Sequence, residues 1–225
     1  IYLNGQPINN VPPHKRGIGM VFQNYALFPH MTVAENLAFP LKVRGLSKAD
    51  CDAKVTRALE MVRLPQMAGR RPAQLSGGQQ QRVAVARALV FDPELVLMDE
   101  PLGALDKNLR EEMQFEIKHI HESLGVSVVY VTHDQSEALT MSNRIAVFND
   151  GVVQQLAAPE VLYEKPENAF VAQFIGENNK LTGKVTAIDG DIAQVTLDGG
   201  GAKVAALAVK CGGVGEKSQL SIRPE

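Results

Sequence analysis

Apolar residues recur along this chain at two spacings, which predict alternating strands and helices. Short apolar runs bounded by turn residues predict strands at 18–22, 95–98, 126–131 and 145–148. We expect the strand 95–98 to be buried on both faces of a parallel sheet and the strand 126–131 to be buried as well. Apolar positions three or four residues apart predict helices that start near Ser47, Gln79 and Lys107. This alternation indicates an α/β layer architecture.

Short polar signals mark the ends of several predicted elements. Ser47 and Asp50 predict a capping box at a helix start, and Gly125 is placed as the C-terminal cap of the helix 107–124. Asn4-Gly5 and Asn149-Asp150-Gly151 predict tight turns between short strands.

The pattern changes from about Leu181 onward. Short alternating apolar runs, separated by Asp-Gly and Gly-Gly turns, predict a small and incomplete β domain over 179–225. The part before it, 1–178, is then an α/β domain that includes a helical subdomain over about 30–92.

Composition and charge narrow the possible functions. The 225 residues are 45% hydrophobic, which allows a sizeable core, and the net charge of −2 gives no electrostatic reason to expect nucleic acid as a partner. Cys51 and Cys211 lack metal-ligand spacing, and we interpret them as reduced thiols. No apolar run approaches the ~20 residues that span a bilayer, so we expect any membrane association to come through a partner. The chain begins with Ile1, and we interpret it as a segment of a longer protein.

The first candidate for chemistry is Ser76-Gly77-Gly78 at a predicted helix start. Backbone N–H groups and the positive end of the helix dipole suit an anion there, and the glycines leave room for a phosphate. An isolated Ser-Gly-Gly is more often a turn before a core helix, and on these residues alone that alternative stays open.

Two acids follow the predicted strand 95–98. Asp99 is placed to hold a water of hydrated Mg²⁺, and Glu100 is placed to accept a proton from an attacking water. The alternative is a pair of solvated acids at a strand end, although Pro101 fixes the turn and Asp106 follows closely.

Together these segments resemble the ATP-binding cassette (ABC) family. The resemblance rests on motifs in a consistent order, which are Gln23, Leu75-Ser76-Gly77-Gly78-Gln79, Asp99-Glu100, Ala104-Leu105-Asp106 and His133. It implies an α/β P-loop NTPase core of the ABC ATPase type with a helical subdomain, truncated at its N-terminus, and a partial C-terminal β-barrel similar to a TOBE domain. It also implies ATP and Mg²⁺ as cofactors.

The resemblance implies a role for each matching residue. Glu100 is the implied general base, His133 contacts the γ-phosphate, and Gln23 senses Mg²⁺ and the attacking water. Asp99 is the second implied metal-site residue. The implied contacts to the nucleotide are Ser76, Gly77, Gly78, Gln79 and Asp106. Alone, His133 is more often an ordinary strand-end histidine and Gln23 a solvated turn residue.

One family motif is absent from the chain. A phosphate-binding loop reads Gly-x-x-x-x-Gly-Lys-Ser/Thr after a strand. The segment 215–218 resembles the end of this motif, but Glu216 separates its glycine from its lysine. The segment 182–185 also resembles it, but it lacks the Ser or Thr that should follow the lysine. We therefore expect the isolated chain neither to bind nor to hydrolyse ATP appreciably.

The segment 12–30 and the β tail resemble the ATPases of bacterial importers. The segment 174–179 resembles the corresponding part of polyamine, opine or phosphonate importers. Iron is a further possible solute. The implied partners are a second copy of the chain, permease subunits that dock near Gln23 to Pro29 and, indirectly, a solute-binding protein. The implied location is the cytoplasmic face of the membrane. Two alternatives remain, a truncated subunit that dimerises without hydrolysis and a soluble ABC factor outside transport.

Overall fold

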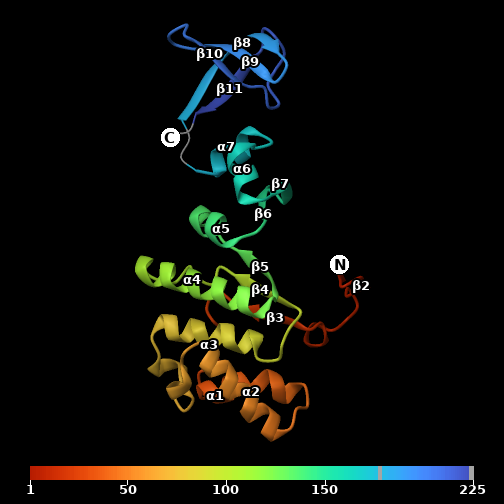
Figure 1. Ribbon diagram of the computed structural model, residues 1–225, viewed down its shortest axis with the longest axis vertical. Helices are drawn as coiled ribbons and strands as arrows, with labels where there is room; N and C mark the ends of the chain where they lie inside the picture. The colour runs from red at the N-terminus through yellow and green to blue at the C-terminus, as the bar shows by residue number, and fades with distance from the viewer. Residues whose placement is uncertain (177–178, 223–225) are drawn as a thin grey trace. The chain divides into compact units, whose positions relative to one another are not determined.

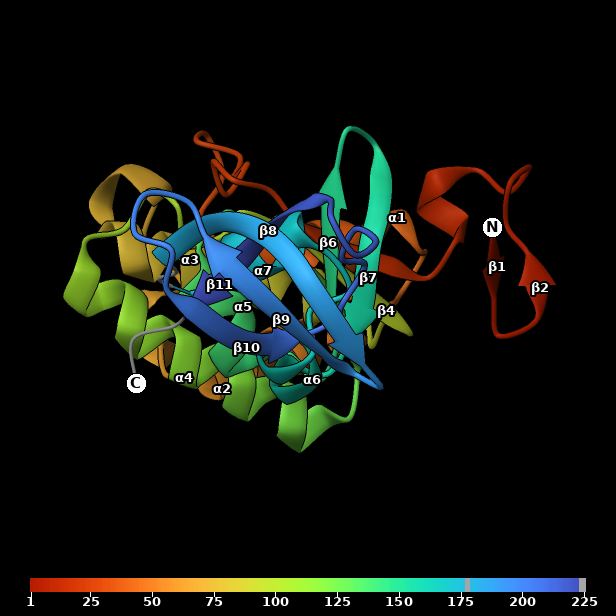
Figure 2. The ribbon, with the colours of Figure 1, turned by 90° about the horizontal axis from the view of Figure 1, so that it is seen from above.

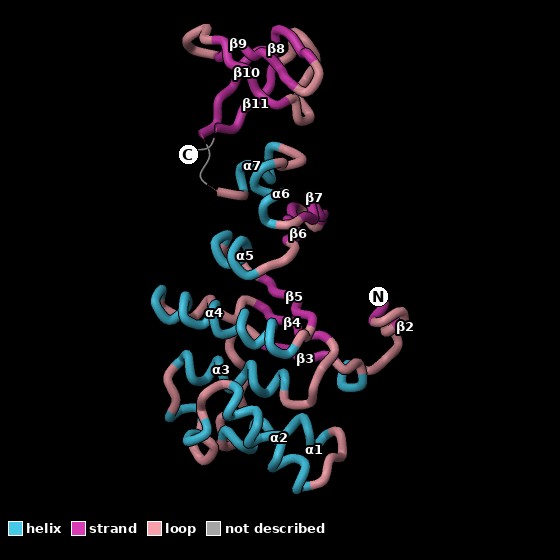
Figure 3. The backbone as a smooth tube through the Cα atoms, viewed as in Figure 1, coloured by secondary structure: helices cyan, strands magenta, loops and turns pink. Residues whose placement is uncertain are grey.

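The computed structural model describes residues 1–176 and 179–222, and the chain divides into two compact units, Ile1–His133 and Asp134–Glu225. Figures 1 and 3 show the order of the elements along the chain. The expected domain boundary between 178 and 179 lies next to residues outside the described ones, so it stays a prediction.

Unit 1 contains a parallel three-stranded sheet and the helices packed on it. Its first elements form a hairpin of β1 (Tyr2–Leu3) and β2 (Gln6–Pro7), joined by the predicted Asn4-Gly5 turn, in which both residues have positive φ. The sheet has the order β3-β4-β5, from β3 (Ile18–Val21), β4 (Leu95–Asp99) and β5 (Ser127–Val131). The helices are α1 (Val33–Val43), α2 (Lys48–Met61), α3 (Gly77–Leu89) and α4 (Lys107–Leu124), with short 3-10 turns at Pro13–Lys15, Pro65–Met67 and Pro72–Gln74.

One face of this sheet is covered and the other is open within unit 1. Gly19, Val21, Val96 and Met98 are buried, and a Cβ on Gly19 would lie 2.4 Å from the carbonyl oxygen of Ala88, so α3 packs directly against β3. On the opposite face Met20 is 40% exposed, Val129 52% and Val131 48%. The expectation that β4 is buried on both faces and that β5 is buried was therefore wrong, because the helices of the unit cover only one face.

Local signals at the helix ends decide where α1, α2 and α4 begin and end. Thr32 and Glu35 form a capping box at the start of α1. Ser47 caps α2 by accepting the N–H of Asp50, but the Asp50 carboxylate accepts the Ser47 hydroxyl at 2.6 Å instead of the Ser47 backbone N–H. The predicted capping box there is thus half formed. Gly125 ends α4 in the left-handed conformation, as predicted.

The helices α1, α2 and α3 form a helical lobe whose core holds Leu37, Leu41, Leu59 and Val83. Asn36 of α1 is fully buried. Its amide oxygen accepts the N–H of Phe28 at 2.8 Å, and its amide nitrogen donates to the carbonyls of Phe28, Met31 and Thr32. A single buried side chain therefore fixes the loop that leads from β3 into α1.

Unit 2 contains a helix-flanked hairpin and a second, antiparallel sheet. The hairpin pairs β6 (Ile145–Asn149) with β7 (Val152–Ala157) through the predicted turn at Asp150-Gly151. Its core residues are Ile145, Val147, Leu162, Val171 and Ile175, to which the flanking helices α6 (Pro159–Glu164) and α7 (Ala169–Phe174) contribute. The short helix α5 (Gln135–Met141) precedes them.

The predicted β tail forms a four-stranded antiparallel sheet of order β10-β9-β8-β11. Its strands are β8 (Asn179–Asp189), β9 (Ile192–Leu197), β10 (Lys203–Leu207) and β11 (Lys217–Ile222). Figure 2 shows β8 curving across the sheet, and its register shifts between Val185 and Ala187. The inward face of this sheet holds a separate apolar cluster of Val185, Ala193, Val195 and Leu220. The sheet is consistent with the expected partial barrel.

Candidate functional site

Glu100 lies in an uncommon backbone conformation immediately after β4. Its φ is +42°, which costs an L-residue on the order of 1–2 kcal/mol. Its N–H donates to the carbonyl of Val131 at 3.0 Å, and its carbonyl accepts the N–H of Gly103 at 3.1 Å. Hydrogen bonds on both sides thus hold the residue in this conformation, and strain of this kind is concentrated at functional sites.

Two of the predicted site residues meet the Glu100 carboxylate. His133 Nε2 lies 2.7 Å from Glu100 Oε1, and Gln23 Nε2 donates to Glu100 Oε2 at 3.2 Å. Gln23 follows β3, Glu100 follows β4 and His133 follows β5. The carboxyl ends of neighbouring parallel strands lie at one edge of a sheet, and this edge is the usual ligand position in open α/β folds. The topology therefore brings together three residues that are distant in sequence.

The geometry leaves the Glu100 carboxylate able to act as a base. The His133 side chain is 87% exposed and the Glu100 side chain 27%, so solvent screens their contact and weakens it. Each carboxylate oxygen has two acceptor sites, and among the described residues each contacts one donor. A water molecule at this edge can therefore still donate a hydrogen bond to Glu100.

Asp99 is exposed and ends β4, next to Glu100 in sequence. It shares the open face of the sheet with Leu95 and Leu97, since side chains alternate along a strand. Across the described part of the chain, no three His, Cys, Asp or Glu side chains are grouped to hold a metal ion. Mg²⁺ keeps most of its water and needs only one or two protein carboxylates, so the oxygen donors of Asp99 and Gln23 suit it chemically.

The segment Ser76–Gln79 forms a complete capping box at the start of α3. Ser76 Oγ accepts the N–H of Gln79 at 3.3 Å, and Gln79 Oε1 accepts the N–H of Ser76 at 3.0 Å. The N–H groups of Gly77 and Gly78 have no recorded acceptor among the described residues. The cap thus uses the side chains of Ser76 and Gln79 and leaves two backbone donors for an anion.

The two glycines have different reasons to lack a side chain. A Cβ on Gly78 would lie 2.9 Å from both methyl carbons of Leu109, so a side chain there would press on the Leu109 side chain of α4. A Cβ on Gly77 would meet Leu105 at 3.6 Å, which is an ordinary contact, and Gly77 is exposed. Close internal packing therefore accounts for a glycine at position 78 and not at position 77.

Asp106 caps the helix that follows the Glu100 turn. Its Oδ1 accepts the N–H of Leu109 at 3.0 Å, which starts α4. Leu102 and Leu105 are buried between Glu100 and Asp106, and Arg110 donates to the Leu105 carbonyl at 3.1 Å. The loop 101–106 is therefore anchored at both ends.

Sequence reasoning missed Arg87, near the end of α3. Its guanidinium donates to the carbonyls of Tyr25 and Ala26, in the loop just after Gln23. An arginine in a helix of otherwise regular pattern gives no sequence signal of such a contact.

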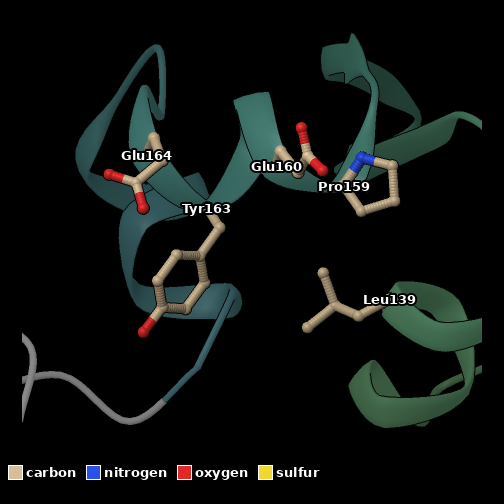
Figure 4. Close-up of a pocket in the computed structure, with 5 residues that line it drawn as sticks. All are labelled: Leu139, Pro159, Glu160, Tyr163 and Glu164. Atoms are coloured by element: carbon tan, nitrogen blue, oxygen red, sulfur yellow. The ribbon is translucent and has the colours of Figure 1, made fainter. Parts of the chain in front are cut away.

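A separate open cleft of about 450 Å³ lies in unit 2. Figure 4 shows that Leu139 of α5 and Pro159 and Tyr163 of α6 face its interior, whereas the Glu164 carboxylate points away from Leu139. It contains none of the predicted site residues.

Residues 1–103, which include Gln23, the α3 cap and Glu100, match the ABC transporter family. This result confirms the family and the α/β fold class expected from the motifs.

The chain is 54% identical over 225 residues to the spermidine/putrescine import ATP-binding protein PotA of Pseudomonas aeruginosa. It is 52% identical over 230 residues to the protein of that name from Chromobacterium violaceum and 51% identical over 222 residues to the one from Acetivibrio thermocellus. These alignments cover 100%, 100% and 99% of this chain. The chain spans 62%, 62% and 61% of the length of these relatives.

No helix in the described ranges of the chain is long and apolar enough to cross a membrane. Cys51 is buried and Cys211 half-buried, and neither forms a disulfide.

Proposed function

We propose that this chain is the nucleotide-handling part of an ATP-hydrolysing subunit of an ABC importer. The observation that carries the proposal is the meeting of Gln23, Glu100 and His133 at the carboxyl edge of the parallel sheet. One carboxylate with two polar donors around it suits the activation of a water molecule. The family match of residues 1–103 supports phosphoryl transfer as the reaction class.

Each residue has a distinct task in this proposal. ATP bound with Mg²⁺ supplies the phosphoryl group that is transferred to water. Glu100 accepts the proton of the attacking water, while Gln23 and His133 orient that water and the terminal phosphate. In this proposal Asp99 and Gln23 provide oxygen donors for Mg²⁺.

The start of α3 serves a second copy of the subunit. The free N–H groups of Gly77 and Gly78, with the positive end of the helix dipole, suit the phosphates of a nucleotide held by the partner. Ser76 and Gln79 shape that helix start, and Asp106 lies at the start of the adjacent α4. A homodimer would then enclose each nucleotide between two subunits.

The transported solute is a polyamine, a proposal supported by the names of the PotA relatives. The subunit would lie at the cytoplasmic face of the membrane, attached to permease subunits and, through them, dependent on a solute-binding protein. Phe28 lies 4.8 Å from Phe39, ring centre to ring centre, and 6.1 Å from His30. This aromatic group, which includes Phe28 of the segment Gln23–Pro29, is a suitable apolar surface for the permease.

Uptake of radiolabelled spermidine tests the importer proposal. Cells that lack the gene for the full-length protein containing this chain should lose uptake, the unaltered gene should restore it, and the Glu100→Gln form should not. Labelled sulfate and a labelled sugar serve as control solutes. Unchanged spermidine uptake in the deleted cells, with loss of a control solute, would show that the solute is not a polyamine.

A further inference from the structure

The loop after Gln23 has an unusual backbone. Tyr25 and Ala26 have φ values of +58° and +48°, so two successive residues with a Cβ take the left-handed conformation. Single non-glycine residues visit this region at a cost in free energy, and two in a row need compensating contacts. Contacts with other parts of the protein must therefore hold the loop in this conformation.

Arg87 supplies those contacts. Its Nη1 donates to the carbonyl of Ala26 at 2.8 Å, and its Nη2 donates to the carbonyl of Tyr25 at 2.9 Å. The guanidinium carbon also lies 5.7 Å from the centre of the Phe28 ring. One rigid guanidinium thus binds both left-handed residues and the aromatic residue that follows them.

The surroundings of Arg87 suit a residue that holds this loop in place, and we call its contacts with Tyr25 and Ala26 the clamp. Burial lowers the pKa of its guanidinium, although an arginine stays charged at any ordinary pH. Among the described residues, the salt bridges include no carboxylate partner for Arg87. The backbone carbonyls of Tyr25 and Ala26 therefore compensate the buried charge, and hydrogen bonds to charged donors are stronger than neutral ones.

The clamp joins two parts of the candidate site. Arg87 lies near the C-terminal end of α3, the helix that begins at the Ser76 cap, and Tyr25 lies two residues after Gln23. On the far side of the loop, Asn36 accepts the N–H of Phe28 at 2.8 Å. The backbone between Gln23 and Phe28 is thus fixed from α3 and from α1.

We propose that Arg87 is a positioning residue, which holds Tyr25 and Ala26 in the left-handed conformation and thereby keeps the Gln23 amide against Glu100. A shift of α3 would then move Gln23 relative to the carboxylate. This inference rests on the proposed ATP hydrolysis for its functional consequence, but the clamp itself can be tested without ATP.

Hydrogen–deuterium exchange of the 225-residue chain tests the clamp directly. Arg87→Gln should speed exchange in the segment 23–31 by about 10- to 100-fold, because charge-assisted hydrogen bonds to the loop are lost. Arg44→Gln is the matched control, since Arg44 also donates to a backbone carbonyl, that of Pro40, and stacks on an aromatic ring, that of Phe91. It should leave exchange in 23–31 unchanged.

A rescue variant separates loop positioning from general destabilisation. Ala26→Gly removes the steric cost of φ = +48°, so in the Arg87→Gln background it should restore several-fold of the lost protection in 23–31. Arg87→Lys keeps the charge but not the two-pronged geometry, and it should fall between the parent and Arg87→Gln. If Arg87→Gln does not fold, Arg87→Lys with and without Ala26→Gly gives the same comparison.

Kinetics of the full-length protein that contains this chain test the consequence. Arg87→Gln should lower kcat about 10-fold and leave the KM for ATP within about twofold, because Gln23 is misplaced while nucleotide binding is kept. Arg44→Gln should match the parent. The proposal is overturned if both Arg87 variants exchange at the parent's rate in the segment 23–31. It is also overturned if exchange in this segment is faster while kcat stays at the parent's value. Absence of ATP hydrolysis in the parent would instead refute the proposed function and leave the exchange result valid.

Discussion

Glu100→Gln keeps the size and shape of the side chain but removes the carboxylate that lies between His133 and Gln23. In the structure, Oε1 of Glu100 lies 2.7 Å from His133 Nε2 and Oε2 accepts the Gln23 amide at 3.2 Å. A glutamine retains one acceptor oxygen and places an NH₂ group at the other position, where it faces a donor. The substitution therefore removes one of the two contacts and also the carboxylate that could accept a proton.

The two consequences differ greatly in size. The contact with His133 is largely solvent-exposed, so its loss should change the free energy of unfolding by at most about 1 kcal/mol. Loss of a general base typically slows chemistry about 10²- to 10⁴-fold, which corresponds to about 2.7 to 5.4 kcal/mol of barrier. We thus expect a large fall in kcat with a nearly unchanged melting temperature.

The assay measures ATP hydrolysis, nucleotide binding and oligomeric state of the full-length protein. With ATP and Mg²⁺, size-exclusion chromatography should show a lasting dimer for Glu100→Gln and mostly monomer for the parent, because in the proposed function hydrolysis releases the dimer. Glu94→Gln is a matched control, since Glu94 lies just before the other end of β4 and its carboxylate accepts the Asn4 amide at 2.7 Å, away from Gln23 and His133 in sequence. Hydrolysis by Glu100→Gln within a few-fold of the parent would remove Glu100 from the role of base.

Four further outcomes are expected. The 225-residue chain alone should show no micromolar affinity in a titration with labelled ATP and Mg²⁺, because it contains no phosphate-binding loop. In the full-length protein, Ser76→Arg should abolish ATP-driven dimerisation and spare ATP binding by the monomer, and an equal loss of both would contradict binding to the partner's nucleotide. Gly78→Ala should lower stability by about 1–3 kcal/mol in thermal unfolding because its Cβ would press on Leu109, whereas Gly77→Ala should be tolerated. Asp99→Asn should weaken Mg²⁺-dependent nucleotide binding, measured by calorimetry with and without Mg²⁺, and unchanged Mg²⁺ dependence would exclude Asp99 as a metal-site residue.

The sequence by itself determined the elements whose signals are local. Ser47 caps the start of α2, Gly125 ends α4 with a left-handed residue, and Asn4-Gly5 makes its turn. Such features depend on nearby backbone groups and conformational preferences, so a short window of residues is enough to predict them. The order of the motifs was likewise sufficient to identify the ABC family.

The tertiary structure alone decided which distant groups meet and which faces are covered. Gln23 and Glu100 are 77 residues apart and come together because parallel pairing aligns the ends of β3 and β4. Apolar runs could not show that one side of β4 and β5 is open, since burial depends on which elements pack there. The close approach of Gly78 to Leu109 and the contact of Arg87 with Tyr25 likewise depend on atoms that packing brings within a few ångströms, which no local pattern encodes.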